Sequence, residues 1–566
     1  TVTNPITLST GGLTYDANGQ NSTLSGVISG SGNITFTGSG VTTLSATNTY
    51  TGSTTINSGA SLVNNGSIAT SSGVTNNGTF TNNGQAPGVT NAGTFTNGAN
   101  GTAASLINTG TATNRGTITG TVTNNAGTFT NAGTTGNWYN AATVNNTGTM
   151  GNGTNVGTFA NAGTVGTVTN NTGGTFTNNG TTGAVANNAT FINNANKTTG
   201  AVANTGTFTN AGTTGAVTGN TGTFTNSGTT GAVTNSTGGT FTNSGTTGDW
   251  INNGTVTNTG IMGNGTNYSD FTNNGTVGTV DNQGTFTNNN TTGAVTNTGT
   301  FTNSGTTTTV TNNTGGTFTN TGTAGDWLNN ATLSNSGTMG NGTNNGTMTN
   351  TGTVGTTTNT GTFTNTGTVG TVTNSGAMTN SGTLGAVTNT GTLTVTGASS
   401  IGDLVNSGTY DATGLTLGSS GRNYTQTGTG ITIIDGNKRY STNGTASLAG
   451  GIVVNNSPTA IGKYTYFTAD SVSGKYDTLV TSAPGNYRLA YTPTAVQLWL
   501  MPDNSVTQGQ LNGLASNLSN MNALATSTTA GSINSDCGAF GEKGGCISVN
   551  YGASRAGTGD LNTAGI

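Results

Sequence analysis

Very few residues of this 566-residue chain could carry out chemistry. There is no His, the only Glu is Glu542, and the only Cys residues are Cys537 and Cys546. Ser-His-Asp and Cys-His catalysis, His-based metal sites and hydrolysis by a Glu pair therefore lack their residues. The acids between residues 63 and 400 are too scattered to predict a catalytic pair: Asp249, Asp270, Asp281 and Asp326. We therefore expect no enzyme, no cofactor and no metal site.

The two cysteines lie nine positions apart in a Gly-rich segment near the end of the sequence. A loop of that kind closes easily, and a disulfide between Cys537 and Cys546 would fit an oxidising compartment. The alternative is two free thiols with no role.

Threonine hydroxyls are the other groups that could contact a partner, and they recur in Thr-Phe-Thr triplets. In a β-strand, alternation places the Phe on one face and both Thr on the other. If such strands stack, the Thr residues form two outward files of hydroxyls and methyls. The candidate contact residues are Thr79, Thr81, Thr94, Thr96, Thr207, Thr209, Thr223 and Thr225. Ordinary Thr preference for strands would produce the same pattern.

The composition excludes the common classes of chain. With 29% hydrophobic and 4% charged residues and 99 Gly, the sequence cannot build several ordinary globular cores. A net charge of −4 argues against a disordered polyelectrolyte, and ten scattered cations give no nucleic-acid footprint. No apolar run approaches the ~20 residues of a membrane helix. The elements that position the Thr residues must therefore be something other than a compact domain.

A short repeat supplies those elements between residues 63 and 400. The unit Gly-Thr-Phe-Thr-Asn-x-Gly-Thr-Thr-Gly-Ala-Val-Thr-Asn occurs at 222–235, and at 206–219 with Gly219 in place of the last Asn. A fixed period is typical of a solenoid, and Thr-flanked single apolar residues indicate strands. We therefore predict an all-β parallel β-helix of roughly 21 coils of ~16 residues, a rod of ~100 Å. The Phe positions should form a buried file, and Asn at the turns should form amide ladders.

A longer repeat places Trp138, Trp250 and Trp327 each twelve residues before a Met. These Trp residues could line a stripe that binds sugars or a partner. The structural alternative, which we favour, is that each fills a wider coil where the repeat is locally altered, because burial of an aromatic in so polar a zone is favourable.

Composition divides the chain into four predicted segments. Residues 1–62 form an N-terminal β-helix, and 63–400 form the Gly/Thr/Asn-rich solenoid. Residues 401–502 are denser in apolar and aromatic groups and form a β-stranded cap. Residues 503–566 contain an amphipathic helix at about 504–526, with Leu511, Leu514 and Leu518 on one face, and then a strand from 546 to 551.

Both ends of the chain resemble a known family. Residues 24–36 and 49–62 resemble the autotransporter-associated β-helix repeat of bacterial type V secretion passengers. Residues 462–499 are similar to the β-stranded region that ends such passengers, and the 504–526 helix resembles the linker to the outer-membrane β-barrel. The resemblance implies a right-handed parallel β-helix that ends at the first strand of its own barrel. The middle of the chain is similar only in repeat style, and its period is shorter than the family's.

This resemblance implies an adhesin of the AIDA and antigen 43 type on the surface of a Gram-negative bacterium. We expect autoaggregation, biofilm formation or attachment, with another copy of the chain or surface glycans as the partner. Repeated uncharged faces suit many weak contacts in parallel. Two alternatives remain open. Thr-x-Thr files also occur in β-helical ice-binding proteins, and carboxylates on a β-helix could hydrolyse sugars.

Overall fold

The computed structural model describes residues 1–415, 422–503 and 505–526. The chain divides into two compact units, Thr1–Met378 and Thr379–Ile566. Cys537, Cys546 and the predicted strand 546–551 lie outside the described residues. Together the described parts form an all-β parallel β-solenoid with a C-terminal β-sheet and one helix, which confirms the predicted fold class.

Most coils of the first unit's repeat zone contain three short strands; in two coils the second and third strands join into β53 (Thr306–Asn312) and β55 (Thr323–Asn329). A typical coil runs through β43 (Thr255–Asn258), β44 (Ile261–Met262) and β45 (Gly265–Asn267). The four-residue strands, apart from β36 (Val217–Asn220), pair with one another in one sheet, here called sheet A. The two-residue and three-residue strands share the second sheet, here called sheet C. The Asn-Gly, Ser-Gly and Thr-Gly pairs between strands supply the turns that fold the coil.

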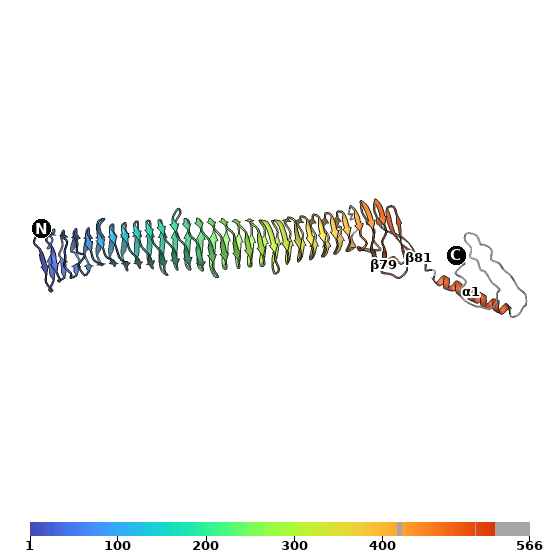
Figure 1. The fold of residues 1–566 in the computed structure, drawn as a ribbon, viewed down its shortest axis with the longest axis horizontal. Helices are drawn as coiled ribbons and strands as arrows, with labels where there is room; N and C mark the ends of the chain where they lie inside the picture. The colour runs from blue at the N-terminus through green and yellow to red at the C-terminus, as the bar shows by residue number, and fades with distance from the viewer. Residues whose placement is uncertain (416–421, 504, 527–566) are drawn as a thin grey trace. The chain divides into compact units, whose positions relative to one another are not determined.

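Every strand pairs in parallel with the equivalent strand one coil away. Thus β43 pairs with β46 (Asp270–Asn273), and Val256 stands opposite Phe271. Coils are 15 to 17 residues long, as the intervals between Asn76, Asn91 and Asn108 illustrate. The stacked coils follow one another in sequence order from blue to yellow in Figure 1. Stacking between coils is therefore as predicted.

The earliest coils are longer. Ser22 in β3 (Ser22–Leu24) pairs with Thr42 in β6 (Val41–Leu44), and Val41 in β6 pairs with Ser61 in β8 (Ser61–Asn64), so each of these two coils spans 20 residues. Within the repeat zone, some 17-residue coils gain two residues in one turn, as before β40 (Thr240–Asn243). There Gly238 has a φ of 82°, a left-handed conformation that glycine adopts without strain.

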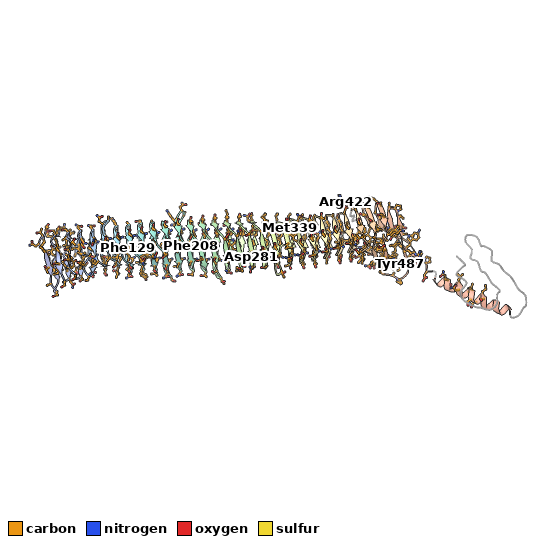
Figure 2. The ribbon with its side chains drawn as sticks, in the orientation of Figure 1. Phe129, Phe208, Asp281, Met339, Arg422 and Tyr487 are labelled. Carbon is orange, nitrogen blue, oxygen red and sulfur yellow. The ribbon has the colours of Figure 1, made fainter. Side chains whose placement is uncertain are left out.

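A file of Phe side chains fills the core on the side of sheet A (Figure 2). Phe208, Phe224 and Phe241 are fully buried, and consecutive ring centroids lie 4.8 Å apart with nearly parallel planes. Val217 and Val233 of sheet C are also fully buried. The predicted Phe file is confirmed, and like-on-like stacking explains how so few apolar residues form a continuous core.

Two ladders of buried Asn side chains border this core. Each Asn ends a strand, and its Nδ2 donates to the Oδ1 of the Asn one coil later at 2.6–2.9 Å. The sequence predicted amide ladders at the turns, and turn amides do pair between coils, as Asn289 Nδ2 donates to Asn274 Oδ1 at 2.8 Å. The two long ladders, however, consist of buried Asn residues that end strands and face inward, which the sequence analysis did not predict. The first ladder contains Asn64, Asn82, Asn97, Asn114 and their successors to Asn365, and the second runs from Asn76 to Asn374.

The ladders have a direction and a defined start. Donation always runs toward the C-terminus, so the first amides, Asn64 and Asn76, have acceptor oxygens with no partner among the described residues. The preceding coil presents Leu44 and Ile56 at the same positions. Each ladder therefore starts where the preceding coil has an apolar side chain in place of a donor amide.

The second unit contains further parallel coils and then a different sheet. Asn389 Nδ2 donates to Asn406 Oδ1 at 2.7 Å, and the next coil places Gln426 at that position. The sheet β74-β77-β81-β80 contains Tyr440–Ser441, Gly462–Thr468, Ala495–Met501 and Asn486–Thr492, with β81 antiparallel to both neighbours. Helix α1 spans Ser505–Thr526, as predicted. No described helix is both long and apolar enough to cross a bilayer.

Candidate functional site

The predicted Thr contact residues stack in register on the outer face of sheet A. Thr79 pairs with Thr94 and Thr81 with Thr96 in β10 (Thr79–Asn82) and β13 (Thr94–Asn97). The same holds for Thr207 with Thr223 and Thr209 with Thr225 in β34 (Thr207–Asn210) and β37 (Thr223–Asn226). In each strand the first Thr is exposed and the second is half-buried.

The exposed file is long and nearly uncharged. From β10 to β62 (Thr362–Asn365), the first residue of every sheet A strand is Thr, except Asp270 in β46. Adjacent files are two residues apart along the strand, ~6.6 Å, and adjacent strands are ~4.8 Å apart. The outer face of sheet A is therefore a two-dimensional array of hydroxyl and methyl groups.

The three Trp residues are buried in sheet C, where most coils have Val. Trp138, Trp250 and Trp327 are 3–4% exposed, and their Nε1–H groups donate to the carbonyls of Gly151, Gly263 and Gly340 at 2.8–3.0 Å. Burial and a satisfied N–H are what a structural role requires. These side chains do not form a binding stripe.

The coils on the two sides of Trp250 differ in length. Trp250 stands opposite Val233, 17 residues earlier, and opposite Gly265, 15 residues later. A Cβ on Gly265 would lie 2.2 Å from Trp250 Cδ2, so the indole occupies the space that a side chain of the next coil would fill. The second Gly of each Met-Gly-Asn-Gly-Thr-Asn segment makes room for the Trp side chain. The sequence analysis missed this signal.

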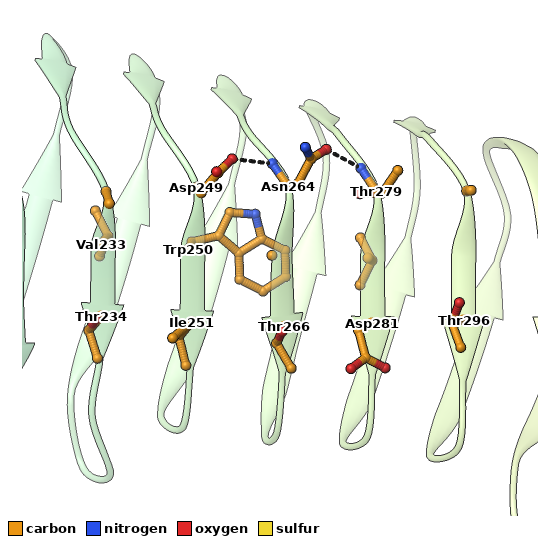
Figure 3. Close-up of a pocket in the computed structure, with 14 residues that line it drawn as sticks. Val233, Thr234, Asp249, Trp250, Ile251, Asn264, Thr266, Thr279, Asp281 and Thr296 are labelled. Carbon is orange, nitrogen blue, oxygen red and sulfur yellow. Dashed lines mark hydrogen bonds between the residues drawn. The ribbon is translucent and has the colours of Figure 1, made fainter.

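A polar chain crosses the coils beside each Trp. The backbone N–H of Asn264 donates to Asp249 Oδ1 at 3.0 Å, and the N–H of Thr279 donates to Asn264 Oδ1 at 2.8 Å (Figure 3). Asn137 and Asp326 accept the corresponding N–H groups beside the other two Trp residues. These Asx side chains satisfy backbone donors at the bend of sheet C.

An open cleft of about 610 Å³ lies on the outer face of sheet C over Trp250. Two rows of side chains line it, with the buried column of Val and Trp between them (Figure 3). The upper row contains Asp249, Asn264 and Thr279, and the lower row contains Thr234, Ile251, Thr266, Asp281 and Thr296. Ile251, on the lower row, is 44% exposed and is therefore accessible to a ligand. We call these two rows the Trp250 cleft.

The cleft brings together two acids that the sequence did not pair. Asp249 and Asp281 lie two coils apart, on opposite rows, while Asp270 lies on sheet A. Two coils correspond to ~10 Å along the stack, and the rows are ~6.6 Å apart. Their backbones are therefore farther apart than the paired carboxyl groups of glycosidases. No group of three metal-ligating side chains occurs among the described residues.

The second unit has a small internal cavity of about 60 Å³ lined by tyrosines, including Tyr410, Tyr424 and Tyr466. Burial raises the pKa of all three phenols above the ordinary value. The Tyr466 hydroxyl and the Ser399 hydroxyl have no hydrogen-bond partner among the described residues. The volume suits a few ordered waters rather than an organic ligand.

Comparison with the models of known protein families gives no match, and comparison with curated proteins gives none either. The fold alone therefore defines the class of this protein. It is a long parallel β-solenoid of about 27 turns.

Proposed function

We propose that this chain is the surface-displayed passenger of a Gram-negative autotransporter and acts as an adhesin. Its outer faces would bind identical faces on other cells, or surface glycans, and so cause autoaggregation, biofilm formation or attachment. The observation that carries the proposal is the Thr file on sheet A, which repeats in register with a single charge, Asp270. Repeated weak contacts add in affinity without a deep pocket.

Lack of charge matters when two identical rods meet through the same face. A face with several charges of one sign would repel its copy, whereas Thr hydroxyls both donate and accept hydrogen bonds. We further propose that the protein is not an enzyme and uses no cofactor, since His is absent and only one Glu is present.

The test is settling of bacterial cells that display the full chain. Thr223→Lys with Thr240→Lys places two cations on the sheet A file, and we expect these cells to settle more slowly than cells that display the wild-type chain. The matched control, Ser227→Lys with Ser244→Lys, places the same charges in the turns that follow those strands. Equal settling of both double variants and wild type would refute self-association through sheet A.

A second candidate function is ice binding, which the same array favours. Its regular ~6.6 by ~4.8 Å spacing presents methyls and hydroxyls at fixed intervals. Thermal hysteresis of the purified chain separates the two candidates: a freezing-point gap that Thr223→Lys abolishes would support ice binding, and no gap would exclude it.

A further inference from the structure

We propose that the Trp250 cleft binds a linear glycan that contains amino sugars. This inference deepens the proposed function, because it names a surface ligand and the face that binds it. The face is the outer side of sheet C, which is distinct from the Thr file on sheet A.

The cleft has the form of a site for a chain molecule. It crosses five coils, from Ala232 and Thr234 to Ala294 and Thr296, so it extends ~19 Å along the stack. Its volume of about 610 Å³ lies within the range of ligand sites, and it is open along its length. An oligosaccharide fits these dimensions better than a monosaccharide does.

The backbone around the cleft argues against a peptide ligand. Peptides that add to sheets use free backbone groups at a strand edge. Here β42 (Trp250–Asn252), β45 and β48 (Val280–Asn282) each have parallel neighbours in the stack, so their backbone groups are already used. Only side chains remain to recognise a ligand.

The side chains present acceptors and one apolar contact. Asp249 uses Oδ1 for the Asn264 N–H, and its other oxygen has no hydrogen bond within the described coils. Asp281 Oδ2 accepts only from the exposed Gln283 Nε2 at 3.2 Å. Sugar hydroxyls and ammonium groups donate to carboxylates, while the C–H face of a sugar ring can pack on Ile251.

Charge selects an amino sugar over an acidic one. In the first unit the only Lys and Arg residues are Arg115 and Lys197, and neither lines the cleft. No cation of the first unit therefore neutralises Asp249 and Asp281 there. A glycan with ammonium groups supplies the missing charge, whereas uronic acids and phosphates are repelled.

The experiment is calorimetric titration of the full chain with a glucosamine hexamer, a glucosamine monomer and oligogalacturonate. We expect the hexamer to bind, the monomer to bind far more weakly and oligogalacturonate not to bind. Asp249→Asn with Asp281→Asn should weaken hexamer binding about two- to thirtyfold, the combined range for two exposed charge pairs, and high salt should also weaken it.

Two matched controls separate the cleft from general charge. Asp270→Asn removes a nearby carboxylate that lies on sheet A, outside the cleft. Ile261→Thr removes an exposed Ile outside the cleft and is the control for Ile251→Thr. Both controls should bind as wild type does. Equal loss in Asp270→Asn, tight binding of oligogalacturonate, or no binding of the hexamer would each overturn the inference.

The settling assay tests the proposed function separately from the glycan site. Cells that display Asp249→Asn with Asp281→Asn should still aggregate through sheet A. Aggregation without hexamer binding by wild type overturns only the glycan site, whereas hexamer binding without aggregation overturns only self-association.

Discussion

Replacing one buried ladder amide tests what holds the solenoid together. Asn258 is fully buried, accepts from Asn243 Nδ2 at 2.8 Å and donates from its own Nδ2 to Asn273 Oδ1 at 2.8 Å. Asn258→Asp keeps the size and shape of the side chain but exchanges the Nδ2 donor for an oxygen. That oxygen then faces Asn273 Oδ1, which loses its amide donor and keeps the Gly275 N–H at 3.2 Å.

The magnitude depends on pH. At pH 7 the variant buries an unpaired carboxylate, and we expect the free energy of local opening to fall by about 3–5 kcal/mol. Burial raises the pKa of this new carboxyl above its ordinary value of about 3.9. The folded state then binds more protons than the unfolded state, so the variant loses stability as pH rises from about 4 through the raised pKa. Near pH 4 the neutral acid donates to Asn273, and the loss should shrink to about 1 kcal/mol.

Hydrogen-exchange mass spectrometry of the full chain measures this loss coil by coil, which suits a repeat protein because its unfolding need not be two-state. Asn274→Asp is the control, since Asn274 is an exposed residue next to the ladder, and it should change opening by less than about 0.5 kcal/mol. A loss in Asn258→Asp that is small at pH 7, or equal at both pH values, would refute the ladder as a stabilising hydrogen-bond chain.

Three further predictions concern the core. Gly265→Ala should destabilise its coil by about 3 kcal/mol, because the new methyl overlaps the Trp250 indole, whereas Gly73→Ala, with its nearest atom at 3.7 Å, should be nearly neutral by hydrogen exchange. Phe224→Ala should cost about 3–5 kcal/mol through the cavity it leaves, and exchange protection should fall first in the adjacent coils. Burial raises the pKa of Tyr50 to about 12, so stability should fall as pH rises from about 10 to 12, because the unfolded chain releases this proton first. Ultraviolet titration of tyrosinate in Tyr50→Phe should lack one late phenol, and an unchanged titration would contradict the prediction.

The sequence by itself determined the coil and its stacking. Thr-Phe-Thr alternation fixes which side chains face inward, and Gly-containing pairs fix the turns. In a solenoid each coil packs on a near copy of itself. The alternation within one coil therefore also predicts which residues pair between coils. The buried Phe file and the register of Thr207 with Thr223 therefore followed from the period alone.

Only the tertiary structure decided the features that depend on sequence differences between neighbouring coils. Whether a Trp fits is settled by the Gly one coil later, and single-coil patterns do not contain that information. The buried Asn residues form ladders because stacking places an amide above and below each of them, and a single coil does not contain these partners. Asp249 and Asp281, 32 positions apart, share a cleft because coil lengths of 15 residues bring their rows together. The lengths of the coils between two side chains determine whether they become neighbours, and those lengths are known only once the fold is known.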